Sequence, residues 1–147
     1  MMPEEEFLRI ELDMSVRGEF DRSLLHEAIA FKKLNVAVAL VERGAPLDVR
    51  DSKGQTPLQY AIVFSFWDLA RMLLEKGANP NVCDKFGNNA LWTACLRPEK
   101  DYDFIEKLVE RGADPNNKNG SGRSAVDFAK QSNNAQLLKM IQPNAIH

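Results

Sequence analysis

The sequence is poor in the residues on which disulfide frameworks and most metal sites depend. It has 147 residues but only two cysteines, Cys83 and Cys95, and two histidines, His26 and His147. Two cysteines do not make a disulfide framework in a chain of this length, and no Cys/His cluster has the spacing of a zinc site. We therefore expect free thiols in a reducing compartment, no metal and no other cofactor.

Long apolar runs and a strong charge of either sign are also missing. No apolar stretch is long enough to span a bilayer, and the acidic start Met-Met-Pro-Glu-Glu-Glu has the wrong charge for a signal peptide. The net charge is only -2, whereas nucleic-acid-binding domains are usually broadly basic. We therefore expect a cytoplasmic protein that binds neither membranes nor nucleic acids.

A set of residues that could act together in catalysis is not evident. Gly120–Gly122 is not part of a phosphate-binding Walker sequence and is interpreted as a hairpin tip. The pairs Asp48/Asp51 and Asp101/Asp103 lie in expected loops, where turn chemistry explains them. Because no nucleophile, base and stabiliser converge, we expect the protein not to be an enzyme.

What the sequence does contain is an internal repeat, which two independent landmarks reveal. A glycine closes each of three similar segments, at Gly44, Gly77 and Gly112. A residue suited to capping a helix N-terminus opens each of four segments, at Ser23, Thr56, Asn89 and Ser124. The glycines are 33 and 35 residues apart, and the openings are 33, 33 and 35 residues apart.

Each unit is predicted to hold two short helices. In the second unit they are expected over residues 57–64 and 66–76, with Pro57 at the first helical position and the closing glycine in a left-handed conformation. The final helix is expected over residues 134–141. The pairs Ser65/Asp68 and Asp103/Glu106 are interpreted as caps of second helices. One helix pair cannot bury its apolar face alone, but stacked pairs can.

This unit resembles the ankyrin repeat. The second unit matches best, over Asp51–Leu58 and Leu73–Asn81, and the first matches at Leu25–Ala28. The third keeps Gly112–Asn116, and the degenerate fourth keeps Gly122–Val126. The resemblance implies an all-α ankyrin-repeat solenoid of helix-turn-helix units joined by β-hairpin-like loops. The implied divisions are a capping segment 1–17, repeats 18–50, 51–83 and 84–118, and a degenerate capping repeat 119–147.

Several features depart from the family pattern. The third repeat carries two extra residues between its helices, within residues 97–103. Trp92 stands where the family usually has the histidine that His26 retains, and both Trp92 and Trp67 are open to two interpretations, local packing or ligand contact. In the capping segment we expect residues 4–9 to end a helix and residues 8–14 to be extended.

The family's variable contact positions can be carried over to this chain unit by unit. The implied partner-binding residues are aromatic, aliphatic or basic: Phe20, Arg22, Phe31, Arg50, Lys53, Val63, Phe64, Lys85, Phe86, Leu96, Arg97 and Arg123. Aromatic and arginine side chains are typical anchors of protein interfaces. We therefore expect a protein partner with an acidic, partly apolar docking surface. The alternative is that some phenylalanines pack between repeats and the cations only solvate the edge.

Three functional interpretations remain. The first is a stoichiometric inhibitor, because the chain resembles small bacterial ankyrin immunity proteins paired with toxins, and is similar in size to ankyrin inhibitors of cyclin-dependent kinases. The second is a scaffold or adaptor, which requires a second binding patch; the convex side offers none that is obvious beyond the inserted loop at residues 97–103. The third is an enzyme, but the sequence shows no converging set of catalytic residues. We expect a monomer.

Overall fold

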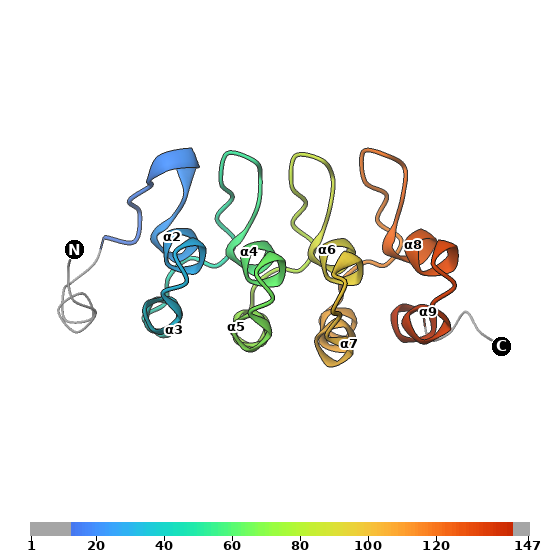
Figure 1. Cartoon of the computed structure of the whole chain (residues 1–147). Coiled ribbons are helices and arrows are strands. Elements are labelled where there is room, and N and C mark those ends of the chain that lie inside the picture. The colour runs from blue at the N-terminus through green and yellow to red at the C-terminus, as the bar shows by residue number, and fades with distance from the viewer. Residues whose placement is uncertain (1–12, 143–147) are drawn as a thin grey trace.

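Helix pairs stacked side by side give the chain its shape in a computed structural model that describes residues 13–142 (Figure 1). A short turn, η1 (Glu19–Asp21), precedes the first pair. The inner helices are α2 (Leu24–Ala30), α4 (Pro57–Val63), α6 (Ala90–Leu96) and α8 (Ala125–Gln131). The outer helices are α3 (Leu34–Glu42), α5 (Trp67–Glu75), α7 (Tyr102–Glu110) and α9 (Ala135–Ile141). Loops project from the inner row like fingers (Figure 1). The expected all-α solenoid is confirmed.

The four predicted N-caps open the four inner helices. The side-chain oxygens of Ser23, Thr56, Asn89 and Ser124 each accept a hydrogen bond from the backbone N–H three residues later, at 3.0–3.3 Å. Each bond satisfies one of the donors left free at a helix start. Gly44, Gly77 and Gly112 are left-handed, with φ between 83° and 101°, as predicted for helix ends.

The predicted caps of two outer helices are wrong. Helix α5 starts after Phe66, which makes no side-chain cap, and Ser65 has a left-handed backbone with φ 60°. Ser65 closes α4 instead: its N–H bonds to the carbonyl of Ile62, and the Phe66 N–H bonds to that of Ala61. A residue in this tight turn cannot also open the next helix.

In the third repeat the two extra residues change the turn between the helices. Arg97 is extended after α6, so the chain travels further before α7 begins. Asp101, rather than Asp103, then caps α7, with its Oδ1 accepting the Phe104 N–H at 3.0 Å. Asp103 lies inside the helix. The insertion therefore gives α7 a side-chain cap that α5 lacks.

The core lies between the two rows of helices and repeats from unit to unit. Leu25, Leu58, Leu91 and Val126 are buried equivalents on the inner helices. Leu40, Leu73 and Leu108 are their counterparts on the outer ones. Each helix packs on its partner and on the adjacent units, which is how a solenoid builds one continuous core. The predictions for residues 4–12 fall outside the described residues. Met14 packs partly on the core, but within a turn rather than an extended stretch.

Backbone hydrogen bonds join the projecting loops into a row. The Ser52 N–H donates to the Phe20 carbonyl at 2.8 Å, and the Lys85 N–H donates to the Lys53 carbonyl at 3.0 Å. The Gly120 N–H repeats the bond to the Phe86 carbonyl at 2.8 Å. Gly54 permits this close approach, because a Cβ there would lie 2.9 Å from the Lys85 nitrogen. The loops therefore hold one another at fixed positions.

Candidate functional site

The predicted apolar contact residues lie on the surface. Six of them are between 37% and 67% exposed: Phe20, Phe31, Val63, Phe64, Phe86 and Leu96. Phe20 and Phe86 belong to the finger loops, and the other four to the C-terminal ends of inner helices. We call the face made by the finger loops and the inner helices the inner surface. None of these six side chains is part of the buried core.

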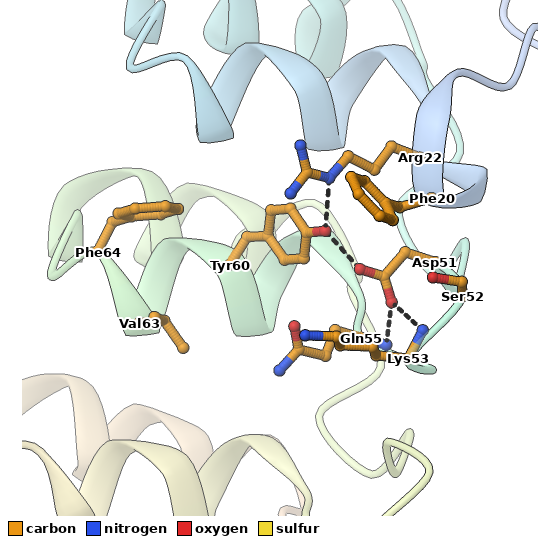
Figure 2. A pocket seen from close by; sticks show the side chains of 9 residues that line it. All are labelled: Phe20, Arg22, Asp51, Ser52, Lys53, Gln55, Tyr60, Val63 and Phe64. Carbon is orange, nitrogen blue, oxygen red and sulfur yellow. Dashed lines mark hydrogen bonds between the residues drawn. The ribbon is translucent and has the colours of Figure 1, made fainter.

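A pocket on the inner surface brings five predicted residues together. Phe20, Arg22, Lys53, Val63 and Phe64 line a hollow of about 280 Å³, together with Asp51, Ser52, Gln55 and Tyr60 (Figure 2). The residues come from η1, the second finger and α4, so the pocket spans two repeats. Phe64 stacks on Phe66 with ring centres 5.7 Å apart, which holds one wall. The pocket combines aromatic walls with cations at its rim.

Tyr60 organises this pocket, and the sequence analysis missed it. Its hydroxyl accepts a hydrogen bond from Arg22 Nε at 3.0 Å and donates one to Asp51 Oδ2 (Figure 2). Burial and the bond to Asp51 raise the pKa of Tyr60 to about 12, so the phenol stays protonated. The Arg22 guanidinium also lies over the rings of Phe20 and Tyr60, at 5.4 and 5.5 Å. Arg22 is therefore held in place before any partner arrives.

Asp51 is the anchor beneath the second finger. Its Oδ1 accepts the backbone N–H groups of Lys53 and Gln55, both at 2.9 Å. Although burial opposes the effect, the hydrogen bonds from Tyr60, Gln55 and Lys53 lower the pKa of Asp51. Asp84 and Asn119 hold the next two fingers by the same pair of bonds. The carboxylate is thus part of the frame rather than a free acid.

Arg50 has an internal role that the sequence analysis did not foresee. Its Nη2 donates to the carbonyl of Cys83 at 3.0 Å, and its Nε to that of Gly54 at 3.2 Å. Arg17 makes the equivalent bond one repeat earlier, from its Nη2 to the Arg50 carbonyl at 2.7 Å. Arg17, Arg50 and Cys83 are spaced 33 residues apart, and this spacing is the signal that could have revealed these two repeated hydrogen bonds. Arg50 therefore ties neighbouring fingers together.

Lys118 and Arg123, on either side of the fourth fingertip, bond within the chain. Arg123 donates from Nη2 to Gln131 Oε1 and lies 5.5 Å from the ring centre of Trp92. Lys118 pairs with Asp127 at 2.8 Å. By contrast, within the described part of the chain neither Lys53 nor Lys85 forms an ion pair. Lys85 lies over the neighbouring Phe86 ring at 5.2 Å. Of the predicted contact cations, Lys53 and Lys85, on the second and third fingers, are the two whose side chains make no hydrogen bond or ion pair among residues 13–142; we call these two the uncommitted cations.

Both tryptophans pack locally. The Trp92 ring meets Phe128 edge-on at 6.2 Å, and the Trp67 ring lies 5.5 Å from that of Phe104. Trp92 also cannot repeat the role of its counterpart His26. The His26 Nδ1 accepts the Ser23 N–H at 3.1 Å, so its Nε2–H donates to the Gln55 carbonyl at 2.8 Å. Gln59 makes the equivalent link, to the Asn88 carbonyl at 3.0 Å.

A second groove lies on the outer helices, where no patch was expected. It is a hollow of about 520 Å³ between α7 and α9. Its lining combines Val109 and Met140 with the polar side chains Glu106, Glu110, Gln136 and Lys139. Val16 and Leu34 are further exposed apolar residues that the sequence analysis did not single out. The outer side is therefore less uniform than the repeat pattern suggested.

The described residues show no sign of metal chemistry or of a membrane span. Among residues 13–142 no three His, Cys, Asp or Glu side chains are grouped as a metal ion requires. Both cysteines are free; Cys95 is buried, which raises its pKa to about 12, and Cys83 is half-buried. No helix in the described part of the chain is long and apolar enough to cross a bilayer. The Cys95 thiol is therefore not an activated nucleophile.

Stacked helix pairs, finger loops and an exposed apolar inner surface define a repeat protein whose surface is built for binding. A family model described as ankyrin repeats (3 copies) matches residues 5–84 and again residues 68–146. The chain belongs to the ankyrin-repeat family, whose members bind protein partners and are generally not enzymes.

A curated relative places such repeats within a longer protein. Over 117 residues the chain is 30% identical to a Danio rerio protein named putative palmitoyltransferase ZDHHC13. The match covers 80% of this chain but 18% of the relative, so the chain spans less than a fifth of that protein's length. The similarity lies in the ankyrin repeats and carries no evidence of catalysis.

Proposed function

We propose that the protein is a stoichiometric inhibitor that binds and neutralises a cognate toxin or enzyme through its inner surface. The observation that carries the proposal is the pocket at Phe20, Tyr60 and Phe64, with Lys53 at its rim. At about 280 Å³ it is slightly smaller than the roughly 300–1,000 Å³ typical of small-molecule sites. It suits one bulky side chain of a partner, and the exposed apolar residues around it supply the rest of an interface.

Rigidity of the inner surface supports an inhibitory role. The fingers are tied to one another by backbone bonds and by Arg50, and Arg22 is held by Tyr60. A surface ordered before binding loses little conformational entropy on association, which favours tight complexes. Tight binding of a single partner is what a stoichiometric inhibitor requires. We place this binding in the cytoplasm, in keeping with two free cysteines.

A scaffold or adaptor is the second candidate function. It is favoured by the groove between α7 and α9, which lies on the outer helices and offers a second surface. Its lining holds two acidic residues, Glu106 and Glu110, and one cation, Lys139, whereas the uncommitted residues of the inner surface are cations. Two surfaces of different charge suit two different partners.

An affinity pull-down from the native host separates the two functions. The tagged protein is compared with a Phe31→Asp/Phe64→Asp variant, and bound proteins are identified by mass spectrometry. An inhibitor captures one dominant partner in near-equimolar amount and loses it in the variant. That partner is then assayed for toxicity or enzyme activity with and without the protein.

The contrary results are equally clear. Several partners of modest affinity, or one retained by the Phe31→Asp/Phe64→Asp variant, would favour a scaffold that uses another face. Val109→Asp, in the groove between α7 and α9, is the matched variant on the outer side. It leaves the inhibitor's partner in place but releases a partner held by that groove.

A further inference from the structure

Three rows of equivalent positions run along the inner surface from repeat to repeat. The fingertip row is Phe20, Lys53, Phe86 and Ser121, at spacings of 33, 33 and 35 residues. The row of C-caps of the inner helices is Phe31, Phe64, Arg97 and Ser132. The row of last helical residues is Ala30, Val63, Leu96 and Gln131. In each row the first three members are apolar or cationic and the fourth is a neutral polar residue.

All three rows change from apolar or cationic residues to neutral polar residues at the fourth repeat. Ser121 lies at the fourth fingertip, and Gln131 and Ser132 are adjacent at the end of α8. None of the three offers the apolar area or charge of its equivalents. Two cations flanking the fourth fingertip are engaged within the chain, since Lys118 pairs with Asp127 and Arg123 bonds to Gln131. At the three row positions the fourth repeat therefore offers a partner neither apolar area nor charge.

The first three repeats leave both kinds of anchor available. Phe86 and Phe31 are 59% and 67% exposed, and Lys53 and Lys85 have no ion-pair partner among residues 13–142. A carboxylate of a partner could pair with either lysine, while an apolar side chain enters the pocket beside Phe64. The fingertip row spans three repeats, so its occupant has to run along the repeat axis.

We infer that the inner surface binds an acidic segment of a partner protein, carrying at least one bulky apolar side chain, which lies across repeats one to three and ends before the fourth. This inference rests on the proposed function and defines its footprint and partner chemistry. The fourth repeat covers the end of the core without joining the interface, as terminal repeats of solenoids commonly do.

Selection of peptides on the intact protein tests the inference. The probe is a displayed library of random peptides long enough to span three repeats, and the best peptide is synthesised and measured by fluorescence anisotropy. Enrichment of Asp and Glu around an aromatic or aliphatic residue is expected. Enrichment of basic peptides, or no enrichment of any peptide, would overturn the inferred chemistry of the partner. Displacement of the peptide by single-stranded DNA that binds with higher affinity would also overturn it.

Matched variants locate the footprint. Phe86→Asp and Ser121→Asp make the same change at the fingertips of the third and fourth repeats, and Phe31→Asp and Ser132→Asp do so at inner-helix C-caps. Each phenylalanine variant is expected to weaken peptide binding by roughly tenfold or more, and each serine variant by no more than about twofold. Circular dichroism verifies that each variant is folded.

The outcomes distinguish this inference from the proposed function. Equal losses in both members of a pair would show that the fourth repeat takes part, and would overturn the footprint. If no acidic peptide binds, yet the host partner is captured and lost in Phe31→Asp/Phe64→Asp, the inhibitor proposal stands and this inference fails. If the peptide binds as expected but its natural source is not neutralised, the inference stands and inhibition fails.

Discussion

At the scale of single residues, His26 and Gln59 do the same work with different chemistry. Each accepts the N–H of its own helix cap and donates to a backbone carbonyl near the next finger. Burial lowers the pKa of His26 below its usual 6.5, because the charged ring is disfavoured inside the protein. Gln59 does not titrate. The chain therefore contains its own control for the effect of pH at this position.

His26→Gln is expected to remove a pH dependence of stability. Since the folded-state pKa of His26 is lowered, its contribution is fully present above about pH 6.5 and declines as the pH falls toward the folded value. Urea unfolding at several pH values between neutrality and 5 measures this. Wild type should lose stability over that range, whereas the variant should change less and match wild type at neutral pH to within about 1 kcal/mol. If the free energy of unfolding of the variant depends on pH as steeply as that of wild type, a group other than His26 causes the pH dependence.

Tyr60→Phe is expected to destabilise the protein by roughly 1–3 kcal/mol, because it leaves buried Asp51 without one partner and Arg22 without its acceptor. Tyr102→Phe is the matched control. Its hydroxyl only accepts from Asn134 Nδ2 at 3.1 Å, on a half-buried side chain. Thermal and urea unfolding compare the two. A smaller loss for Tyr60→Phe than for Tyr102→Phe would show that the Arg22–Tyr60–Asp51 network contributes little.

At the scale of secondary-structure elements, local signals explain why the helices could be predicted. Ser23 and Thr56 cap helices with their own side chains, and the closing glycines need a left-handed backbone, so both signals are contained in a few adjacent residues. The turns between paired helices were harder. Ser65 is typical of a cap, but the tight turn after α4 requires it as the left-handed residue. Only the geometry of both helices together decides that role.

The outer helices are linked by a cluster of charges that no local pattern indicates. Arg71 on α5 bonds to Asp101 and Asp103 at the start of α7, and to Asp68 one turn before it. Asp101 and Asp103 were interpreted as loop residues. Their partner Arg71 lies 30 or more residues away in the sequence, so no local pattern could indicate the contact. Arg71 and Asp101 are half-buried, whereas Asp68 and Asp103 are exposed. The shielded Arg71–Asp101 pair, as part of a network, is expected to stabilise more than an isolated exposed pair does.

Arg71→Met is expected to lower the free energy of unfolding by roughly 1–2 kcal/mol, since three carboxylates are then left close together. Lys107→Met is the control. Its amine only approaches Asp103 at 3.9 Å on an exposed surface, so a change of less than about 0.5 kcal/mol is expected. Urea unfolding at low and high salt measures both. Equal effects of the two substitutions would contradict a structural role for the Arg71 cluster.

At the scale of the whole molecule, the repeat period shows why part of the candidate site was predictable. A fixed register predicts which positions reach the inner surface, and the exposed Phe20, Phe64 and Phe86 follow from it. It does not predict what a side chain does once there. Arg50 and Arg123 lie at contact positions but bond within the chain, and Tyr60 reaches the pocket from a position on α4 that was not among the expected contact positions. These roles depend on distances between repeats.

Substitution of Phe64 is the most direct way to distinguish an effect on partner binding from an effect on folding. Its side chain is 37% exposed, lines the pocket and touches Phe66, so it contributes some packing but is not part of the core. Leu58, on the same helix, is 1% exposed and serves as the contrasting position.

The decisive measurement is the binding of the captured partner to Phe64→Asp, together with the free energy of unfolding of the same variant. We predict that partner binding is lost, that helical circular dichroism is near native, and that the stability loss is no more than about 2 kcal/mol. Leu58→Asp should instead unfold the protein. Retention of the partner by folded Phe64→Asp, or unfolding of Phe64→Asp like Leu58→Asp, would contradict the assignment of the inner surface as the binding surface.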